Sequence, residues 1–138
     1  MANFRSSSLA IAALLATSLS MGSALAQDLK LTGDQEVPPN TSTAVGTGSI
    51  KIDAAGNVSG SVAAPGMAGT MAHIHVGAQG VNGPVIIPLT GSAGDTWTVP
   101  AGAKLTDEQM AAYKAGNLYV NIHTAEHKGG EVRTQLKP

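Results

Sequence analysis

Apolar and polar residues alternate along several short stretches of this chain, which is the pattern of half-buried β-strands. The clearest stretch is Ala72-His73-Ile74-His75-Val76, and residues 118–124 and 131–137 alternate in the same way. Glycine, proline, asparagine and aspartate interrupt the apolar stretches every several residues. Many short strands separated by such turns predict an all-β domain, folded as an antiparallel sandwich or barrel.

The pattern predicts about eight strands. The first contains Leu29 and Leu31, and the others cover residues 48–53, 58–63, 70–76, 85–89, 96–99, 118–124 and 131–137. The second and third strands are separated by a short turn, so we expect them to form a hairpin. One short helix is expected near residues 106–115, because Thr106 and Gln109 have the spacing of a capping box and Gly116 follows as a stop.

Residues 1–26 are predicted to be a cleaved secretory signal peptide. Arg5 supplies a positive start, residues 9–19 are mostly apolar, and Ala24-Leu25-Ala26 fits the cleavage rule. The apolar stretch is too short and too often interrupted by serine to cross a membrane, so we expect no membrane span. Residues 27–138 then form a single domain, and we expect the protein to be periplasmic or secreted.

Composition removes several classes of function. The 138 residues include no cysteine, which excludes disulfides, thiolate zinc sites, iron–sulfur clusters and a cysteine nucleophile. The chain has 8 basic and 9 acidic residues and only four aromatic ones: one tryptophan, two tyrosines and one phenylalanine. We expect no nucleic-acid partner, because such binding needs a basic surface or more aromatic faces for stacking. The G-x-S-x-G motif of serine hydrolases is also absent.

The concentrated chemistry of the sequence lies in its four histidines, His73, His75, His123 and His127. Because alternate residues of a strand share a face, His73 and His75 would point away from the core together, and His123 would do the same on a later strand. If these strands are neighbours, three imidazoles converge on the surface and bind a metal ion. Imidazole nitrogens without sulfur suit copper, with zinc as the alternative ion.

Other residues near this cluster have two interpretations each. His127 could supply a fourth ligand, although a solvated loop histidine is the simpler interpretation. Asn121 and Glu131 lie on the same outer faces and could orient the imidazoles through hydrogen bonds. For Glu131, and equally for Glu36 and Glu126, an exposed surface charge is the usual role.

Several stretches of the chain carry a longer pattern. They are LTGDQEVPP at residues 31–39, AHIHVG at 72–77, NGPV at 82–85, YVNIHT at 119–124 and GGEVRTQL at 129–136. Together they resemble the CHRD domain, a module named for its repeats in the secreted signalling antagonist chordin. The stretches follow the family order over nearly the whole of residues 27–138. The resemblance implies a single-domain exported bacterial protein, in a family whose biochemical role is ill defined.

The H-x-H strand and the terminal strand are similar in logic to those of Cu/Zn superoxide dismutase, an eight-stranded Greek-key barrel. In that enzyme an H-x-H strand supplies two copper ligands. The similarity implies a Greek-key barrel for this chain, and at most a copper-only site. The chain has no cysteine for the dismutase's disulfide and no long histidine-rich loop for a separate zinc ion.

Three functions are compatible with these observations. We favour an exported copper-binding protein that serves sequestration, delivery or resistance. The alternatives are a protein–protein interaction module with incidental histidines, and a copper-only dismutase-like enzyme. The enzyme is less favoured because superoxide is an anion, whereas residues 27–138 carry 7 basic and 9 acidic residues. The oligomeric state is left open, with a homodimer as one alternative.

Overall fold

The structure is a computed structural model that describes residues 26–91 and 95–138. The predicted signal peptide lies outside the described residues, except for its last residue, Ala26. The elements in chain order are β1 Gln27–Thr32, the 3-10 turn η1 Gly33–Gln35, β2 Val45–Ile52, β3 Val58–Ala63, β4 Met71–Val76, β5 Val85–Pro88, β6 Thr90–Gly91, β7 Thr96–Thr98, α1 Asp107–Lys114, β8 Leu118–His123 and β9 Val132–Leu136.

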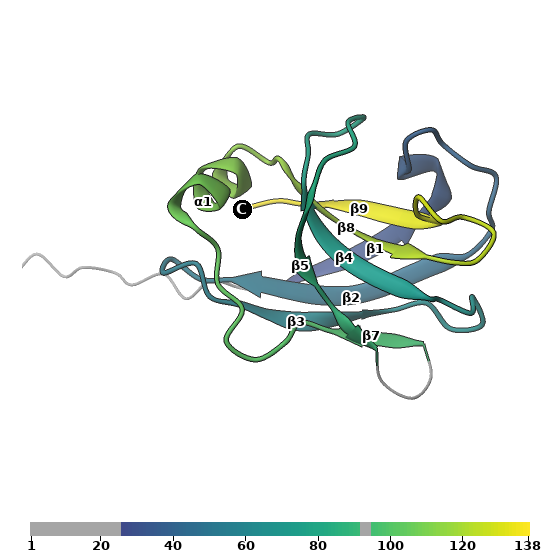
Figure 1. The fold of residues 1–138 in the computed structure, drawn as a ribbon, viewed down its shortest axis with the longest axis horizontal. Coiled ribbons are helices and arrows are strands. Elements are labelled where there is room, and N and C mark those ends of the chain that lie inside the picture. The colour runs from purple at the N-terminus through teal and green to yellow at the C-terminus, as the bar shows by residue number, and fades with distance from the viewer. Residues whose placement is uncertain (1–25, 92–94) are drawn as a thin grey trace, which may run out of the picture.

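The nine strands form one antiparallel sheet in the order β5-β4-β8-β9-β1-β2-β3-β7-β6. Its two outermost strands, β5 and β6, are successive parts of the same chain segment, separated by Leu89. The sheet therefore curls until its first and last strands meet through the chain itself, which gives a nearly closed barrel (Figure 1). Such closure leaves little free strand edge.

The predicted strands are all present, and the all-β antiparallel prediction is confirmed. The count is nine rather than eight because the predicted strand at 85–89 divides at Leu89. Pro88 has no N–H to extend a ladder, and the N–H of Leu89 donates to the carbonyl of Ala72 (2.9 Å) before the chain turns to pair with β7. The predicted hairpin is β2 with β3, paired from Ile52–Val58 to Thr47–Ala63.

The predicted helix is α1, and both halves of its capping box are formed. The backbone N–H of Gln109 donates to the Thr106 hydroxyl (3.2 Å), and the Thr106 N–H donates to the Gln109 side chain (2.9 Å). Met110 and Tyr113 pack against the edge of the core. Across the described ranges, no helix has the length and apolar character needed to cross a membrane.

The inside of the barrel is the hydrophobic core. Strand alternation turns Ile74 of β4 and Val120 and Ile122 of β8 inward, where they are fully buried with Leu31 and Val132. Burial of this apolar surface is the main favourable term in folding, at about 25 cal/mol per Å².

The opposite face of β4, β8 and β9 carries polar side chains, and we call it the polar face. It consists of His73, His75, Tyr119, Asn121, His123, Arg133 and Gln135. The loops at 77–84 and 124–131 lie over it, as their hydrogen bonds to its side chains show. All six positions of β8 are consequently buried, on both faces of the strand.

Candidate metal centre

β4 and β8 are antiparallel neighbours. This is the strand pairing on which the predicted convergence of the histidines depends. His73 lies opposite Asn121 in the register, and Met71 lies opposite His123. One ligand atom from each of His73, His75 and His123 lies within 4.8 Å of the others. The ring centroids are 4.7 Å apart for His73 and His123, and 5.5 Å apart for His73 and His75. The structure thus brings three of the four predicted ligands together.

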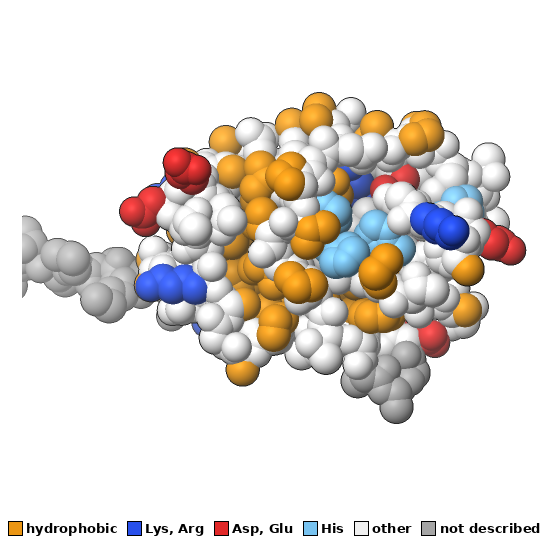
Figure 2. Space-filling view, viewed as in Figure 1, with side chains coloured by type: hydrophobic (Ala, Val, Ile, Leu, Met, Phe, Trp, Pro, Cys, Tyr) orange, Lys and Arg blue, Asp and Glu red, His pale blue; other side chains and the backbone are white. Residues whose placement is uncertain are grey.

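The cluster is more buried than the sequence predicts, and the expectation of a surface site is wrong for two of its members. His75 is 7 % exposed and His123 is 6 % exposed, whereas His73 is half-buried. Strand alternation places these side chains off the core, but it cannot show that loops cover them. Figure 2 shows histidine side chains reaching the surface in the face formed by β4 and β5, bordered by hydrophobic side chains.

Each covering loop orients one histidine through a backbone carbonyl. Nδ1 of His75 lies 2.9 Å from the oxygen of Gly83, and Nδ1 of His123 lies 2.8 Å from the oxygen of Lys128. A carbonyl oxygen only accepts, so each Nδ1 carries the hydrogen and each neutral ring keeps its lone pair on Nε2. Metal-binding histidines are commonly held in this way, by a hydrogen bond from the nitrogen that does not bind the ion.

The Nε2 atoms of His123 and His75 each lie close to one further polar atom. Nδ1 of His73 lies 3.0 Å from Nε2 of His123, a separation at which His73 donates to the lone pair. Nε2 of His75 lies 3.0 Å from Oδ1 of Asn121. When His75 is neutral this second contact places two lone pairs face to face, which is favourable only when a hydrogen or a cation is shared between them.

Burial also affects the protonation of His73 and His75. It lowers the pKa of His75, and it lowers the pKa of His73, where positive charge on His123 and His75 adds to the effect. Both rings are therefore neutral at pH 7, which is the state that binds metal ions.

His75 is packed against a column of two further stacked side chains, Tyr119 and Arg133. The Tyr119 ring is parallel to the His75 ring, with centroids 4.6 Å apart and an angle of 6° between the planes. The Arg133 guanidinium lies 3.4 Å from the centre of the Tyr119 ring. Arg133 is 1 % exposed and donates to the carbonyls of Ala78 and Val81, both at 3.0 Å. It therefore fixes the loop that supplies the carbonyl to His75.

Glu36 lies buried next to this column, so the interpretation of Glu36 as a surface charge is wrong. It is 3 % exposed, and its Oε1 atom has no hydrogen-bond partner among the described residues. Burial raises the pKa of Glu36 to about 7, against the opposing effects of the Arg133 charge and the Asn121 amide. Asn121 thus lies between a buried carboxyl and the His75 ring.

Comparison with known families now identifies the domain. Residues 28–136 match the CHRD domain. The chain belongs to the CHRD domain family. The match includes all four histidines and all nine strands except Gln27, the first residue of β1. The comparisons with curated proteins and with solved structures gave no significant match.

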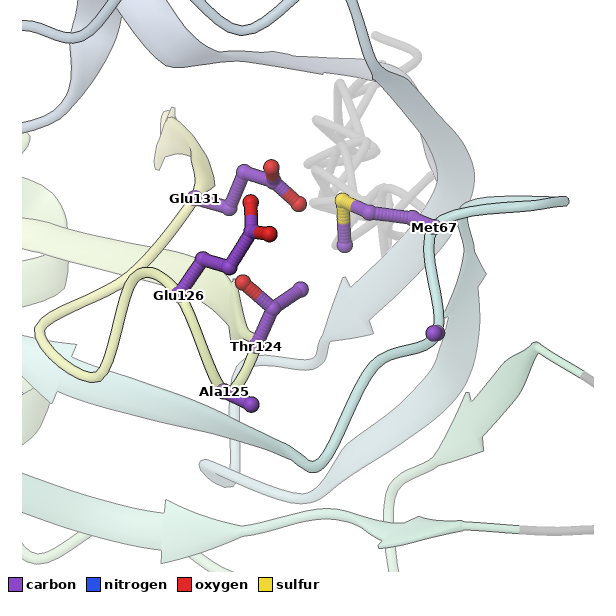
Figure 3. A pocket seen from close by; sticks show the side chains of 6 residues that line it. Met67, Thr124, Ala125, Glu126 and Glu131 are labelled. Atoms are coloured by element: carbon purple, nitrogen blue, oxygen red, sulfur yellow. The ribbon is translucent and has the colours of Figure 1, made fainter.

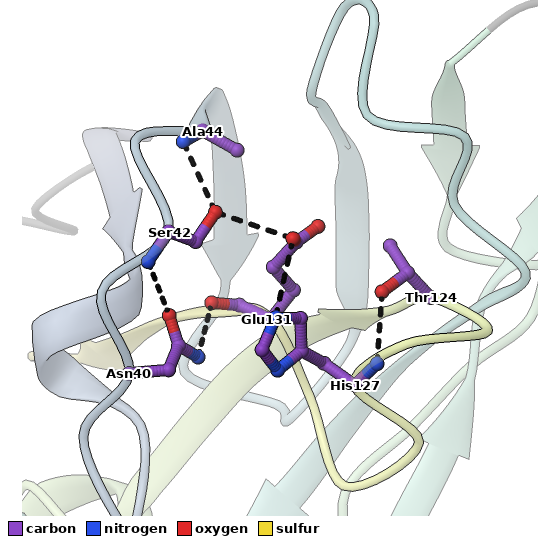
Figure 4. Close-up of polar contacts among 6 residues, drawn as sticks. All are labelled: Asn40, Ser42, Ala44, Thr124, His127 and Glu131. Atoms are coloured by element: carbon purple, nitrogen blue, oxygen red, sulfur yellow. Dashed lines mark hydrogen bonds and ion pairs between the residues drawn. The ribbon is translucent and has the colours of Figure 1, made fainter.

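His127, the fourth predicted ligand, lies outside the cluster of three in this CHRD domain. Its Nε2 is 3.6 Å from Oε1 of Glu131, and its backbone N–H donates to the Thr124 hydroxyl at 3.1 Å. Glu131 in turn accepts from the Ser42 hydroxyl (3.2 Å), and its backbone carbonyl accepts from Asn40 (3.0 Å), as drawn in Figure 4. These contacts join the 124–131 loop to the segment between η1 and β2.

Asn121 and Glu131 were both predicted to orient the imidazoles, and their positions differ. Asn121 contacts His75 directly. Glu131 faces a shallow pocket that it shares with Met67, Thr124 and Glu126, where Figure 3 shows the two carboxylates side by side. The residues that line this pocket include none of the three clustered histidines.

Three residues of the site were not predicted from the sequence: Glu36, Tyr119 and Arg133. The alternation of the last two strands places Tyr119 and Arg133 on the outer faces, and this is the one feature of the sequence that could have indicated their place in the site. Their burial depends on the fold of the 77–84 loop, which the strand pattern does not describe. Glu36 follows η1 and gave no periodic signal.

Proposed function

We propose that this CHRD domain protein is an exported copper-binding protein that holds the ion through His73, His75 and His123. The observation that carries the proposal is the orientation of the two buried rings. His75 and His123 each direct Nδ1–H to a backbone carbonyl, so each ring carries its lone pair on Nε2, the atom through which it would bind the ion. At His123 the copper ion would replace the hydrogen that Nδ1 of His73 donates to this lone pair. The chemical role we propose is sequestration, delivery or resistance, with no catalytic step.

The separation between two of the proposed ligand atoms favours copper(II) over zinc. At metal–ligand bonds of about 2.0–2.1 Å, ligand atoms at a right angle are about 2.9 Å apart, and those at a tetrahedral angle about 3.3 Å apart. Among the proposed ligands, Nδ1 of His73 and Nε2 of His123 are 3.0 Å apart, which is closer to the right-angle value. Right angles are typical of the tetragonal geometry of copper(II), whereas zinc sites are tetrahedral.

We also propose that the barrel has the Greek-key topology of Cu/Zn superoxide dismutase. The arrangement of β3 to β7 supports this. β4, β5, β6 and β7 follow one another along the chain, while β3, which precedes β4, pairs with β7 at the other end of that group, as in a Greek key. Export is proposed on the predicted signal peptide. Amino-terminal sequencing of the protein recovered from the periplasm or medium is expected to begin at Gln27.

Metal analysis and copper(II) spin resonance test the copper proposal. Protein isolated with copper is expected to bind about one ion and to show nitrogen hyperfine splitting from about three imidazoles. His73→Ala and His123→Ala are expected to lower copper(II) affinity at least about tenfold. His127→Ala is the matched control, because it removes an imidazole outside the cluster. Affinity that is unchanged in His123→Ala would overturn the proposal.

The pH dependence of binding gives an independent test. Protons and copper compete for the same nitrogens, so affinity is expected to fall as the pH decreases from about 7 to 5. With several histidines bound together, the loss should be steeper than first order in proton concentration. A binding curve independent of pH over this range contradicts ligation by imidazole.

A further inference from the structure

Met71 is an exposed apolar side chain that core packing does not explain. It is 48 % exposed at the first position of β4. The other methionines within residues 26–91 and 95–138, Met67 and Met110, are partly buried against the core. An exposed methionine on a strand therefore needs another explanation, and its neighbours supply one.

The register places Met71 at the edge of the histidine cluster. Residues 71, 73 and 75 of β4 share the polar face, because side chains two apart in a strand point the same way. Met71 is also directly opposite His123 on β8. Opposite residues in an antiparallel pair have Cβ atoms about 4.5–5.5 Å apart. A methionine with three rotatable bonds can therefore bring its sulfur to the ring of His123.

The other positions of this face are covered or occupied by polar contacts. Tyr119 lies opposite His75 and stacks on it, and Asn121 lies opposite His73 and contacts His75. Met71 and the half-buried His73 are the members of this group that reach the surface, and Figure 2 shows hydrophobic side chains beside the histidines there. A fourth donor would enter the site from this side.

A thioether changes which ion the site prefers. Imidazole binds copper(II) and zinc, whereas thioether sulfur is a soft ligand that favours copper(I). It also has no proton to lose, so its binding does not compete with protons. The combination of three imidazoles with one thioether at the rim accommodates both oxidation states of copper.

We propose that Met71 is a ligand for copper(I), so that the site holds copper in both oxidation states and the sulfur binds only the reduced ion. This inference rests on the proposed copper function. A purely hydrophobic role of Met71 would be preserved by leucine, which has a similar volume but no sulfur. Met71→Leu therefore separates the two roles.

The experiment measures copper(I) affinity in competition with bathocuproine disulfonate, without oxygen, and copper(II) affinity by titration. Met71→Leu is expected to weaken copper(I) binding about tenfold or more and to leave copper(II) affinity within about twofold. Copper(I) X-ray absorption should show a sulfur neighbour that is lost in Met71→Leu. Met67→Leu and Met110→Leu are matched controls and should behave like the parent in all three measurements.

The outcomes distinguish this inference from the proposed function. If the parent protein binds copper(II) through its histidines but Met71→Leu leaves copper(I) affinity and the sulfur signal unchanged, the role of Met71 is overturned and the copper function stands. A parent protein that binds copper(II) but not copper(I) also overturns it. If the parent binds neither ion, the copper function fails, and the inference fails with it.

Discussion

The buried carboxyl of Glu36 leads to a prediction about stability that differs in sign from the usual one. Replacing a buried, charged residue that lies near an arginine commonly destabilises a protein. Here burial raises the pKa of Glu36 from 4.5 to about 7, because the lost hydration outweighs the attraction of Arg133. The folded state therefore favours the neutral carboxyl, and Glu36→Gln imitates that form.

The direction and size of the effect follow from linkage between folding and protonation. Below pH 4.5 the carboxyl is neutral in both the folded and the unfolded chain, so it carries no penalty. Above pH 7 it is ionised in both, and the folded state bears the cost of the buried charge. A difference of 4.5 against about 7 corresponds to about 3 kcal/mol lost from the free energy of unfolding as the pH rises through this interval.

Urea unfolding followed by the fluorescence of the single tryptophan, Trp97, measures this effect. Measurements at several pH values from 5 to 8, with a chelator present, compare Glu36→Gln with the parent. The difference in unfolding free energy between variant and parent should move in favour of Glu36→Gln by about 2–3 kcal/mol from pH 5 to pH 8. Glu126→Gln, the same change at an exposed carboxylate, should show no such trend. A constant difference would show that the effects of burial and of Arg133 on the pKa of Glu36 cancel. A difference that moves against Glu36→Gln would show that the ionised carboxylate is stabilised by Arg133.

Two further predictions concern the polar face. Arg133→Lys keeps the positive charge but loses the planar stacking on Tyr119 and at least one carbonyl contact of the 77–84 loop. We therefore expect the free energy of unfolding in urea to fall by about 2–3 kcal/mol. A decrease below about 0.5 kcal/mol would mean that the loop is held without Arg133. His75→Ala should cost about 2–4 kcal/mol in metal-free protein, and His73→Ala about 1 kcal/mol or less, because only His75 is both buried and stacked. Equal losses in thermal unfolding would contradict the difference in burial.

Strand alternation was enough to predict an all-β sandwich or barrel and to place three histidines on the outer faces of two strands. In β4 and β8 the apolar residues occupy every second position, and this fixes which side chains share a face. The sequence could not fix which strands are neighbours, so the pairing of β4 with β8 stayed conditional. The division at Leu89 was also not predicted, because a continuous apolar stretch gives no sign of where a strand changes partner.

The burial of the polar face could not be predicted from the same pattern. Alternation describes the two faces of a strand but not what lies above them. His75, His123 and Arg133 are buried because two loops fold back over the sheet, and those loops are rich in glycine and have no periodicity. The prediction of a surface site followed from the assumption that a face turned away from the core meets solvent.

The backbone of the 124–131 loop, rather than its side chains, orients His123, and this leads to a last prediction. Nδ1 of His123 contacts the carbonyl oxygen of Lys128, an atom that any residue supplies. Lys128→Ala should therefore keep copper(II) affinity within about twofold of the parent. Gly130 is different, because its φ of +121° is unfavourable for other residues and an added Cβ would meet Oε1 of Glu36 and Nδ2 of Asn121. Gly130→Ala should displace the loop and weaken copper(II) binding about tenfold or more, in the same titration. If Lys128→Ala is the more damaging of the two, the lysine side chain acts at the site and the loop backbone does not set the orientation of His123.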